Sequence, residues 1–101
     1  MLVERRRKLK GYEMMVLLDP DLEDPKGAVE RLGEILAAVG AEGVNVNFWG
    51  RRRLAYPVRK KGDGVYAVFD FSLYPDQVHE LDRRVKLREE VMRHIIVCQE
   101  E

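Results

Sequence analysis

The order of two hydrophobic periods along the chain constrains its fold more than any other feature. Apolar residues recur at spacings of three and four in two segments, residues 25–39 and 75–86, which indicates amphipathic helices. Four other segments alternate or are apolar throughout, as strands do, and they lie at residues 12–18, 44–59, 65–72 and 91–98. The expected order is therefore strand, helix, strand, strand, helix, strand.

With right-handed crossovers, this order most simply gives a ferredoxin-like α+β sandwich, βαββαβ, in which two helices cover one face of a four-stranded antiparallel sheet. The strand at residues 12–18 is apolar on both sides and should be central, next to the strand at 65–72. The other two strands become edges, which suits Pro57 because proline cannot donate a ladder hydrogen bond. Asp24 and Gly40 are expected to cap and stop the first helix.

The long strand at residues 44–59 is expected to present one apolar face at its even positions, on both sides of Gly50. Gly50 itself indicates a bulge or bend that lets the second half curl away from the sheet. Residues 60–64, Lys-Lys-Gly-Asp-Gly, are expected to form a glycine-rich hairpin loop. The even positions concerned are Val44, Val46, Phe48, Leu54, Tyr56 and Val58.

Charge is balanced in total but unevenly distributed. The net charge is zero, yet residues 1–10 carry +4, residues 11–50 carry −6, residues 51–61 carry +6 and residues 62–101 carry −4. Residues 49–61 hold six of the eighteen basic residues and no acid. An edge strand with arginines and aromatic rings suits RNA, which offers phosphates and flat bases. The alternative is that the edge carries cations only to prevent aggregation.

At 101 residues the chain is expected to form a single domain over residues 11–101, preceded by a basic arm at residues 1–10. The arm either orders on an anionic partner or is a solvated tail. A lone cysteine, Cys98, favours a reducing compartment. No apolar run has the length of a membrane span or of a signal peptide, so a cytoplasmic protein without a membrane partner is expected.

Candidate catalytic residues are few. Ser72 is the only serine, threonine is absent, and neither His79 nor His94 has metal-ligand spacing around it. A neighbour is expected to satisfy His94 on its strand. Gly62-x-Gly64 lacks the further glycines and following helix of a phosphate cradle. The sequence therefore predicts no enzyme, no metal, no cofactor and no small-molecule substrate.

One motif is unusually specific. The pattern Trp-Gly-x-Arg-x-Leu-Ala-Tyr-Pro-Val-x-Lys at residues 49–60, with Tyr12-Glu13 opening the first strand, resembles the bacterial small-subunit ribosomal protein six family. The similarity continues through Gly64-x-Tyr66, Pro75, Leu81, and Arg88 to Val91 with Arg93 after it. The resemblance implies the ferredoxin-like fold and no enzymatic activity. It also implies a place on the ribosome, in the platform of the small subunit, where the family binds the central domain of the small-subunit ribosomal RNA as a heterodimer with small-subunit ribosomal protein eighteen.

Two sets of site residues follow. By the resemblance, Arg52, Arg53, Lys60, Arg88 and Arg93 fall on basic family positions, while Arg51, Arg59 and Lys61 join them on charge alone. The predicted RNA-binding set is thus Arg51, Arg52, Arg53, Arg59, Lys60, Lys61, Arg88 and Arg93. Apolar residues left on the open face or edge form the predicted protein-binding set, which is Met15, Leu17, Trp49, Tyr56 and Tyr66.

Two other classes of protein share the expected fold. A small acylphosphatase-like hydrolase needs a glycine-rich anion loop after its first strand, but here residues 19–24 are Asp-Pro-Asp-Leu-Glu-Asp and would repel phosphate. A protein-only interaction module would dimerise through its sheet and would show no salt-sensitive RNA binding.

Overall fold

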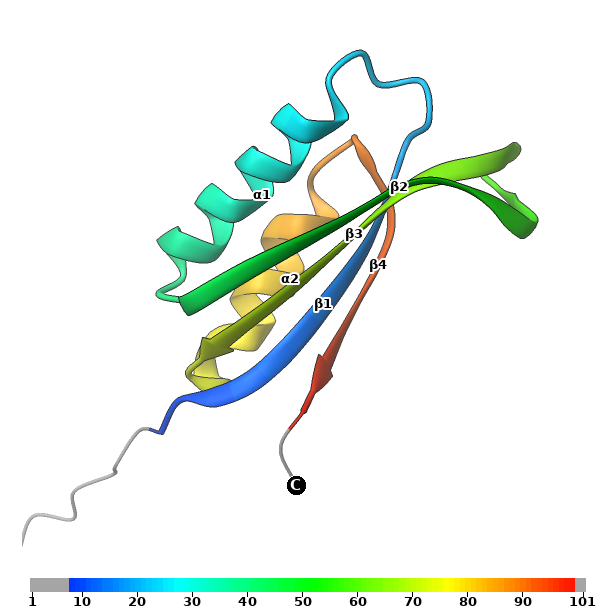
Figure 1. Ribbon diagram of the computed structural model, residues 1–101. Helices are drawn as coiled ribbons and strands as arrows, with labels where there is room; N and C mark the ends of the chain where they lie inside the picture. Colours follow the sequence, from blue (N-terminus) through cyan, green and yellow to red (C-terminus); the bar gives the residue numbers. More distant parts are fainter. Residues whose placement is uncertain (1–7, 100–101) are drawn as a thin grey trace, which may run out of the picture.

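The computed structural model describes residues 8–99. Both helices cover the same face of an antiparallel sheet with strand order β2-β3-β1-β4, and the other face is left open (Figure 1). This confirms the ferredoxin-like sandwich with β1 and β3 central. The elements are β1 (Lys10–Leu18), α1 (Pro25–Ala38), β2 (Glu42–Val58), β3 (Lys61–Leu73), a 3₁₀ turn (Pro75–Gln77), α2 (Val78–Lys86) and β4 (Val91–Cys98).

The N-terminal end of the domain differs slightly from the prediction. β1 begins at Lys10, which pairs with Leu73, so the last residue of the expected basic arm belongs to the sheet. Residues 1–7 of that arm lie outside the described residues. The division into arm and domain therefore stays a prediction.

Helix α1 has the predicted boundaries. The Asp24 side chain accepts a hydrogen bond from the Gly27 N–H at 3.0 Å, and Pro25 takes the first helical position. Gly40, at φ +88°, follows the end of the helix in the left-handed conformation that glycine adopts without steric cost. The apolar stripe is largely buried against the sheet, with Leu32 and Leu36 almost completely covered.

The hydrophobic core lies between the helices and the sheet and leaves β2 outside it. Fully buried side chains come from β1, β3 and both helices, and each such burial stabilises the fold by about 1.5–3 kcal/mol. No residue of β2 is buried. Stability therefore depends on the centre of the sheet, and β2 can carry polar side chains without disturbing it. The fully buried large side chains are Met14, Val16, Leu18, Leu32, Leu36, Phe69, Leu73, Leu81 and Val85.

A bulge at Gly50 moves the second half of β2 onto the opposite face. Phe48 pairs with Ala67, which faces the helices, but the register then shifts and Gly50, at φ +81°, pairs with Tyr66 on the open face. The even positions therefore change sides at Gly50. The predicted bulge is confirmed, but the prediction of one continuous apolar face is wrong. Val44, Val46 and Phe48 lie on the helix side, whereas Leu54, Tyr56 and Val58 line a cavity on the open side.

The turn between β2 and β3 also differs from the prediction. Only Arg59 and Lys60 connect the strands, and both have positive φ, 50° and 64°, the pattern of a type I′ turn. A residue with a side chain pays roughly 1–2 kcal/mol in that conformation. The Arg59 guanidinium donates to the backbone carbonyls of Glu89 (3.3 Å) and Val91 (3.1 Å), and these contacts help to offset the cost.

The glycines expected in that loop lie within β3 instead. A Cβ at Gly64 would overlap the side chain of Leu17 and lie 3.2 Å from Met92 Cε. Gly64 is therefore required for the close approach of β3 to Leu17 on the open face, and not for a turn. The prediction of a glycine-rich loop at residues 60–64 is wrong for this reason.

Candidate nucleic-acid interface

The end of the β2–β3 hairpin, residues 51–64, projects beyond the rest of the sheet (Figure 1). We call it the basic hairpin. Its surface is largely exposed, so its cations can meet a partner without a rearrangement of the core. It carries six of the eight predicted RNA-binding residues, namely Arg51, Arg52, Arg53, Arg59, Lys60 and Lys61.

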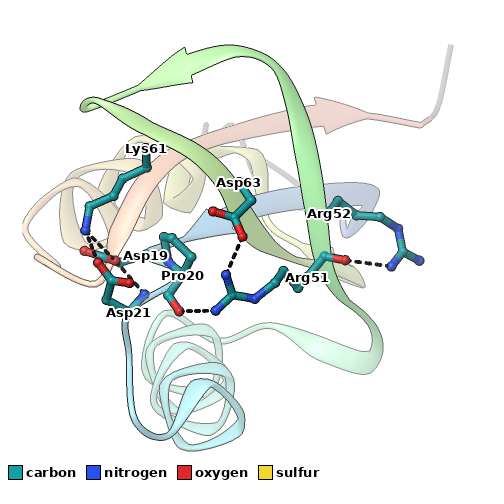
Figure 2. A network of polar contacts seen from close by, with 7 residues as sticks. All are labelled: Asp19, Pro20, Asp21, Arg51, Arg52, Lys61 and Asp63. Carbon is teal, nitrogen blue, oxygen red and sulfur yellow. Dashed lines mark hydrogen bonds and ion pairs between the residues drawn. The ribbon is translucent and has the colours of Figure 1, made fainter.

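Two of these cations are paired with acids of the same chain. Arg51 forms an ion pair with Asp63 through Nη1, and its Nη2 donates to the backbone carbonyl of Pro20 at 2.7 Å (Figure 2). Lys61 forms an ion pair with Asp21 and lies 3.7 Å from the carboxylate of Asp19. Direct RNA contact by Arg51 and Lys61 stays a prediction.

Four cations of the basic hairpin have no acidic partner within residues 8–99, and one of them, Arg59, donates to backbone carbonyls only. Arg53 and Lys60 are exposed and make no ion pair there, and the Arg52 guanidinium donates only to the backbone carbonyl of Arg51, at 3.1 Å. Figure 2 shows the Arg52 side chain extending away from that of Arg51. In the register of the two strands, Arg52 lies opposite Gly64 on the open face, whereas Arg53 lies opposite Asp63 on the helix side without forming an ion pair with it. The available positive charge thus lies on both sides of the basic hairpin.

The two predicted RNA-binding residues outside the basic hairpin differ in their surroundings. Arg88 donates to both carboxylate oxygens of Glu90, at 2.9 and 3.1 Å, and this hydrogen bonding raises the pKa of Arg88 and lowers the pKa of Glu90. Arg93 is exposed, and its Nη1 donates to the hydroxyl of Tyr56 at 2.9 Å. Arg88 therefore has an internal structural partner, whereas Arg93 keeps its charge at the surface.

The open face carries a groove beside these cations. A cavity of about 380 Å³ lies between the basic hairpin and the strands β1 and β4, and four of the five predicted protein-binding residues line it. The fifth, Trp49, packs its ring against that of Tyr66 with 6.2 Å between centroids. We call this the open-face groove, and its lining is Met15, Leu17, Leu54, Ala55, Tyr56, Val58, Tyr66, Arg93, His94 and Ile95.

The predicted protein-binding set lacks three apolar residues that lie on the open face of the sheet. Ile95 is 57% exposed and Val97 is 46% exposed, and both pair with open-face residues of β1. Leu54 reaches the groove only because the Gly50 bulge changes its side. A signal for the first two was present, since β4 is apolar at odd and even positions although an edge strand usually has one polar face.

The remaining chemistry-bearing side chains have ordinary structural roles. His94 Nε2 lies 2.7 Å from Asp82 Oδ1, and this hydrogen bond lowers the pKa of Asp82. The prediction that a neighbour satisfies His94 is confirmed. Across residues 8–99, no three His, Cys, Asp or Glu side chains are grouped as a metal ion would require. Over the same residues, no helix combines the length and apolar character needed to cross a membrane.

Fold and surface together define a ferredoxin-like α+β domain that presents a basic hairpin next to an apolar groove. The family model for ribosomal protein S6 matches residues 11–98 of this chain. The chain belongs to the ribosomal protein S6 family, as the pattern at residues 49–60 predicted. This is a family of structural, non-enzymatic proteins, and RNA binding is the general role of ribosomal proteins of this kind.

Individual relatives agree with the family match. The small ribosomal subunit protein bS6 of Acidothermus cellulolyticus is 46% identical over 92 residues, covering 88% of this chain and 95% of the relative. The bS6 protein of Streptomyces griseus is 47% identical over 89 residues, covering 84% and 91%. The crystal structure of 30S ribosomal protein S6 from Thermotoga maritima matches with a TM-score of 0.82 at 25% identity, covering 91% of this chain and 89% of that one.

A more distant likeness shows the fold alone. The crystal structure of a putative PII-like signaling protein from Thermus thermophilus matches with a TM-score of 0.55 at 14% identity. The same fold thus also occurs in a protein that is described as a signaling protein and not as a ribosomal one.

Proposed function

We propose that this chain is a structural constituent of the small subunit of a cytoplasmic or organellar ribosome, where it binds the central domain of the small-subunit ribosomal RNA together with small-subunit ribosomal protein eighteen. The observation that carries the proposal is the basic hairpin with its four cations that have no acidic partner within residues 8–99, namely Arg52, Arg53, Arg59 and Lys60. The relatives named above are small ribosomal subunit proteins, which supports the same assignment.

RNA binding in this proposal is positional and electrostatic. Arg52, Arg53 and Lys60 pair with backbone phosphates, and the planar guanidinium groups can also stack on an unpaired base. Arg59 and Arg93 add charge at the edge of the same surface, because their hydrogen-bond acceptors are a carbonyl or a hydroxyl and leave the charge unneutralised. With four to six phosphate contacts, the logarithm of affinity should fall with the logarithm of salt concentration with a slope of about −3 to −5.

Protein binding in this proposal uses the open-face groove. Tyr56 is 60% exposed and Trp49 is 42% exposed, so the groove continues into an apolar surface that water covers in the isolated chain. Exposed aromatic and aliphatic side chains around a pocket are typical of protein interfaces. In this proposal protein eighteen covers the groove with apolar side chains.

A binding titration tests the proposal. The protein is mixed with an RNA fragment of the central domain, with and without protein eighteen, at several salt concentrations. We expect salt-dependent binding to the RNA and a one-to-one complex with protein eighteen in sedimentation. A stable homodimer without salt-dependent RNA binding would instead support the protein-only interaction module and reject the proposal.

A further inference from the structure

A compact network of charges joins both strands of the basic hairpin to the loop that follows β1. Arg51 lies on β2, Lys61 and Asp63 lie on β3, and Asp19 and Asp21 lie in the loop (Figure 2). We call these five residues and the backbone carbonyl of Pro20 the ionic clamp. Its members are far apart in sequence, since Arg51 and Pro20 are separated by 31 positions and Lys61 and Asp21 by 40. The clamp is therefore a tertiary contact between the basic hairpin and this loop, and it reaches from Arg51 at the base of the hairpin to Lys61 beside the turn.

Apolar packing does little to orient the basic hairpin. No residue of β2 is buried, and the buried part of β3 begins only at Gly64. The part of the hairpin nearer its tip depends on polar contacts instead. On the open side these are Arg59 with the carbonyls at the start of β4, and Tyr56 with Arg93. On the helix side the contact is the ionic clamp.

The geometry of Arg51 suits a fixed internal role. One nitrogen of its guanidinium pairs with the Asp63 carboxylate, and the other donates to the carbonyl of Pro20, a buried residue, at 2.7 Å. A phosphate that drew Arg51 out of this position would break both contacts and leave that carbonyl without its donor. Both contacts also use the planar fork of arginine, which fixes the side chain in one direction.

Lys61 completes the clamp from the neighbouring strand. Its ammonium group pairs with Asp21 and lies 3.7 Å from Asp19. The hydrogen bond from Lys61 lowers the pKa of Asp21, and the same bond raises the pKa of Lys61. Both groups are therefore charged at neutral pH, and the pair is present in the isolated protein.

The clamp also reaches a cation that has no acidic partner. The backbone carbonyl of Arg51 accepts a hydrogen bond from Arg52 Nη1 at 3.1 Å. The Arg51 side chain is held at the loop after β1 by its contact with Pro20, so the position of the Arg51 backbone carbonyl, which accepts from Arg52, is also restrained. The guanidinium of Arg52 is thereby directed away from the clamp, toward the open side of the hairpin (Figure 2).

We propose that Arg51 and Lys61 are positioning residues, which hold the basic hairpin through the ionic clamp in the orientation that presents Arg52, Arg53 and Lys60 to RNA. This inference rests on the proposed RNA binding. It gives Arg51 and Lys61 a structural role, whereas their charge alone would suggest that they contact phosphates. The competing account is that Asp19, Asp21 and Asp63 merely compete with phosphates for Arg51 and Lys61. The two accounts predict opposite effects when the acids are neutralised.

The test is the double variant Asp21→Asn with Asp63→Asn, which keeps every cation and removes two of the three carboxylate charges of the clamp, those that pair directly with Lys61 and Arg51. Its matched control is Glu23→Gln with Glu30→Gln, which makes the same change in net charge at exposed acids outside the clamp. We expect the clamp variant to bind the RNA fragment roughly fivefold more weakly than the control. We also expect amide hydrogen exchange across residues 51–63 of the RNA-free protein to be roughly tenfold faster in the clamp variant.

The outcomes separate this inference from the proposed function. Tighter RNA binding by the clamp variant than by the control would overturn positioning in favour of competition. Equal affinity would also overturn it, whether or not the amides exchange faster. If the unaltered protein binds no RNA, the proposed function fails. The hydrogen-exchange measurement then still tests the clamp, because unchanged amide exchange in the clamp variant would show that the clamp does not hold the basic hairpin in place.

Discussion

Replacing both Arg52 and Arg53 with alanine is expected to weaken binding to the central-domain RNA at least about tenfold. These are two of the four cations of the basic hairpin that have no acidic partner, so their removal takes away phosphate contacts and breaks no ion pair within residues 8–99. Both side chains are exposed, and exposed positions contribute little to stability, so the melting temperature should stay nearly unchanged. A filter-binding titration and a thermal melt measure the two quantities.

The matched control is the double variant Arg83→Ala with Arg84→Ala on α2. It removes the same charge, but these arginines are already engaged, since their hydrogen bonds to Glu80 lower the pKa of that carboxyl to about 2. We expect its RNA affinity to stay close to that of the unaltered protein. Unchanged affinity in the Arg52 and Arg53 variant would remove the basic hairpin from the RNA site.

The variant Ile95→Glu is expected to weaken the complex with protein eighteen by about a hundredfold, because a carboxylate would be buried in an apolar contact. Ile95 is 57% exposed in the isolated chain and lines the open-face groove, so the substitution should leave the fold intact. Isothermal titration calorimetry with purified protein eighteen measures the loss.

Leu87→Glu provides the comparison for this variant. Leu87 is 69% exposed and follows α2, outside the open-face groove. We expect this variant to bind protein eighteen normally. Equal affinities of the Ile95 and Leu87 variants would place the protein contact elsewhere on the molecule.

Local sequence signals predicted the fold because each acts within a few residues. The cap at Asp24 and the stop at Gly40 set the ends of α1, and the alternation in Val65, Ala67 and Phe69 set the buried side of β3. These features together leave few arrangements for six elements. The order of the strands then followed from the handedness of the crossovers.

The errors arose where a long-range contact decided the outcome. Gly50 indicated a bulge, but the sequence did not show that the register shift would turn Leu54 toward the open face. Gly64 suggested a loop, whereas its real constraint is the nearby Leu17 side chain, 47 positions earlier in the chain. A glycine required by tertiary packing looks the same in sequence as one required by a turn.

The candidate site was predictable as a set of charges but not as a set of contacts. Counting cations identified the basic hairpin, yet it could not separate Arg51, which meets Asp63 and Pro20, from Arg53, which meets no acid within the part of the chain that the structure describes. The acids near Lys61 come from a loop 40 positions away. Such pairings depend on how the basic hairpin folds against that loop, which no local pattern encodes.

The central claim is that the basic hairpin contacts the small-subunit ribosomal RNA. Ultraviolet cross-linking within purified small ribosomal subunits, followed by peptide mapping, measures this contact directly. We predict RNA cross-links within residues 51–64 and few on the surface of α1 and α2. Cross-links confined to the helices, or none between this protein and the small-subunit RNA, would contradict the account.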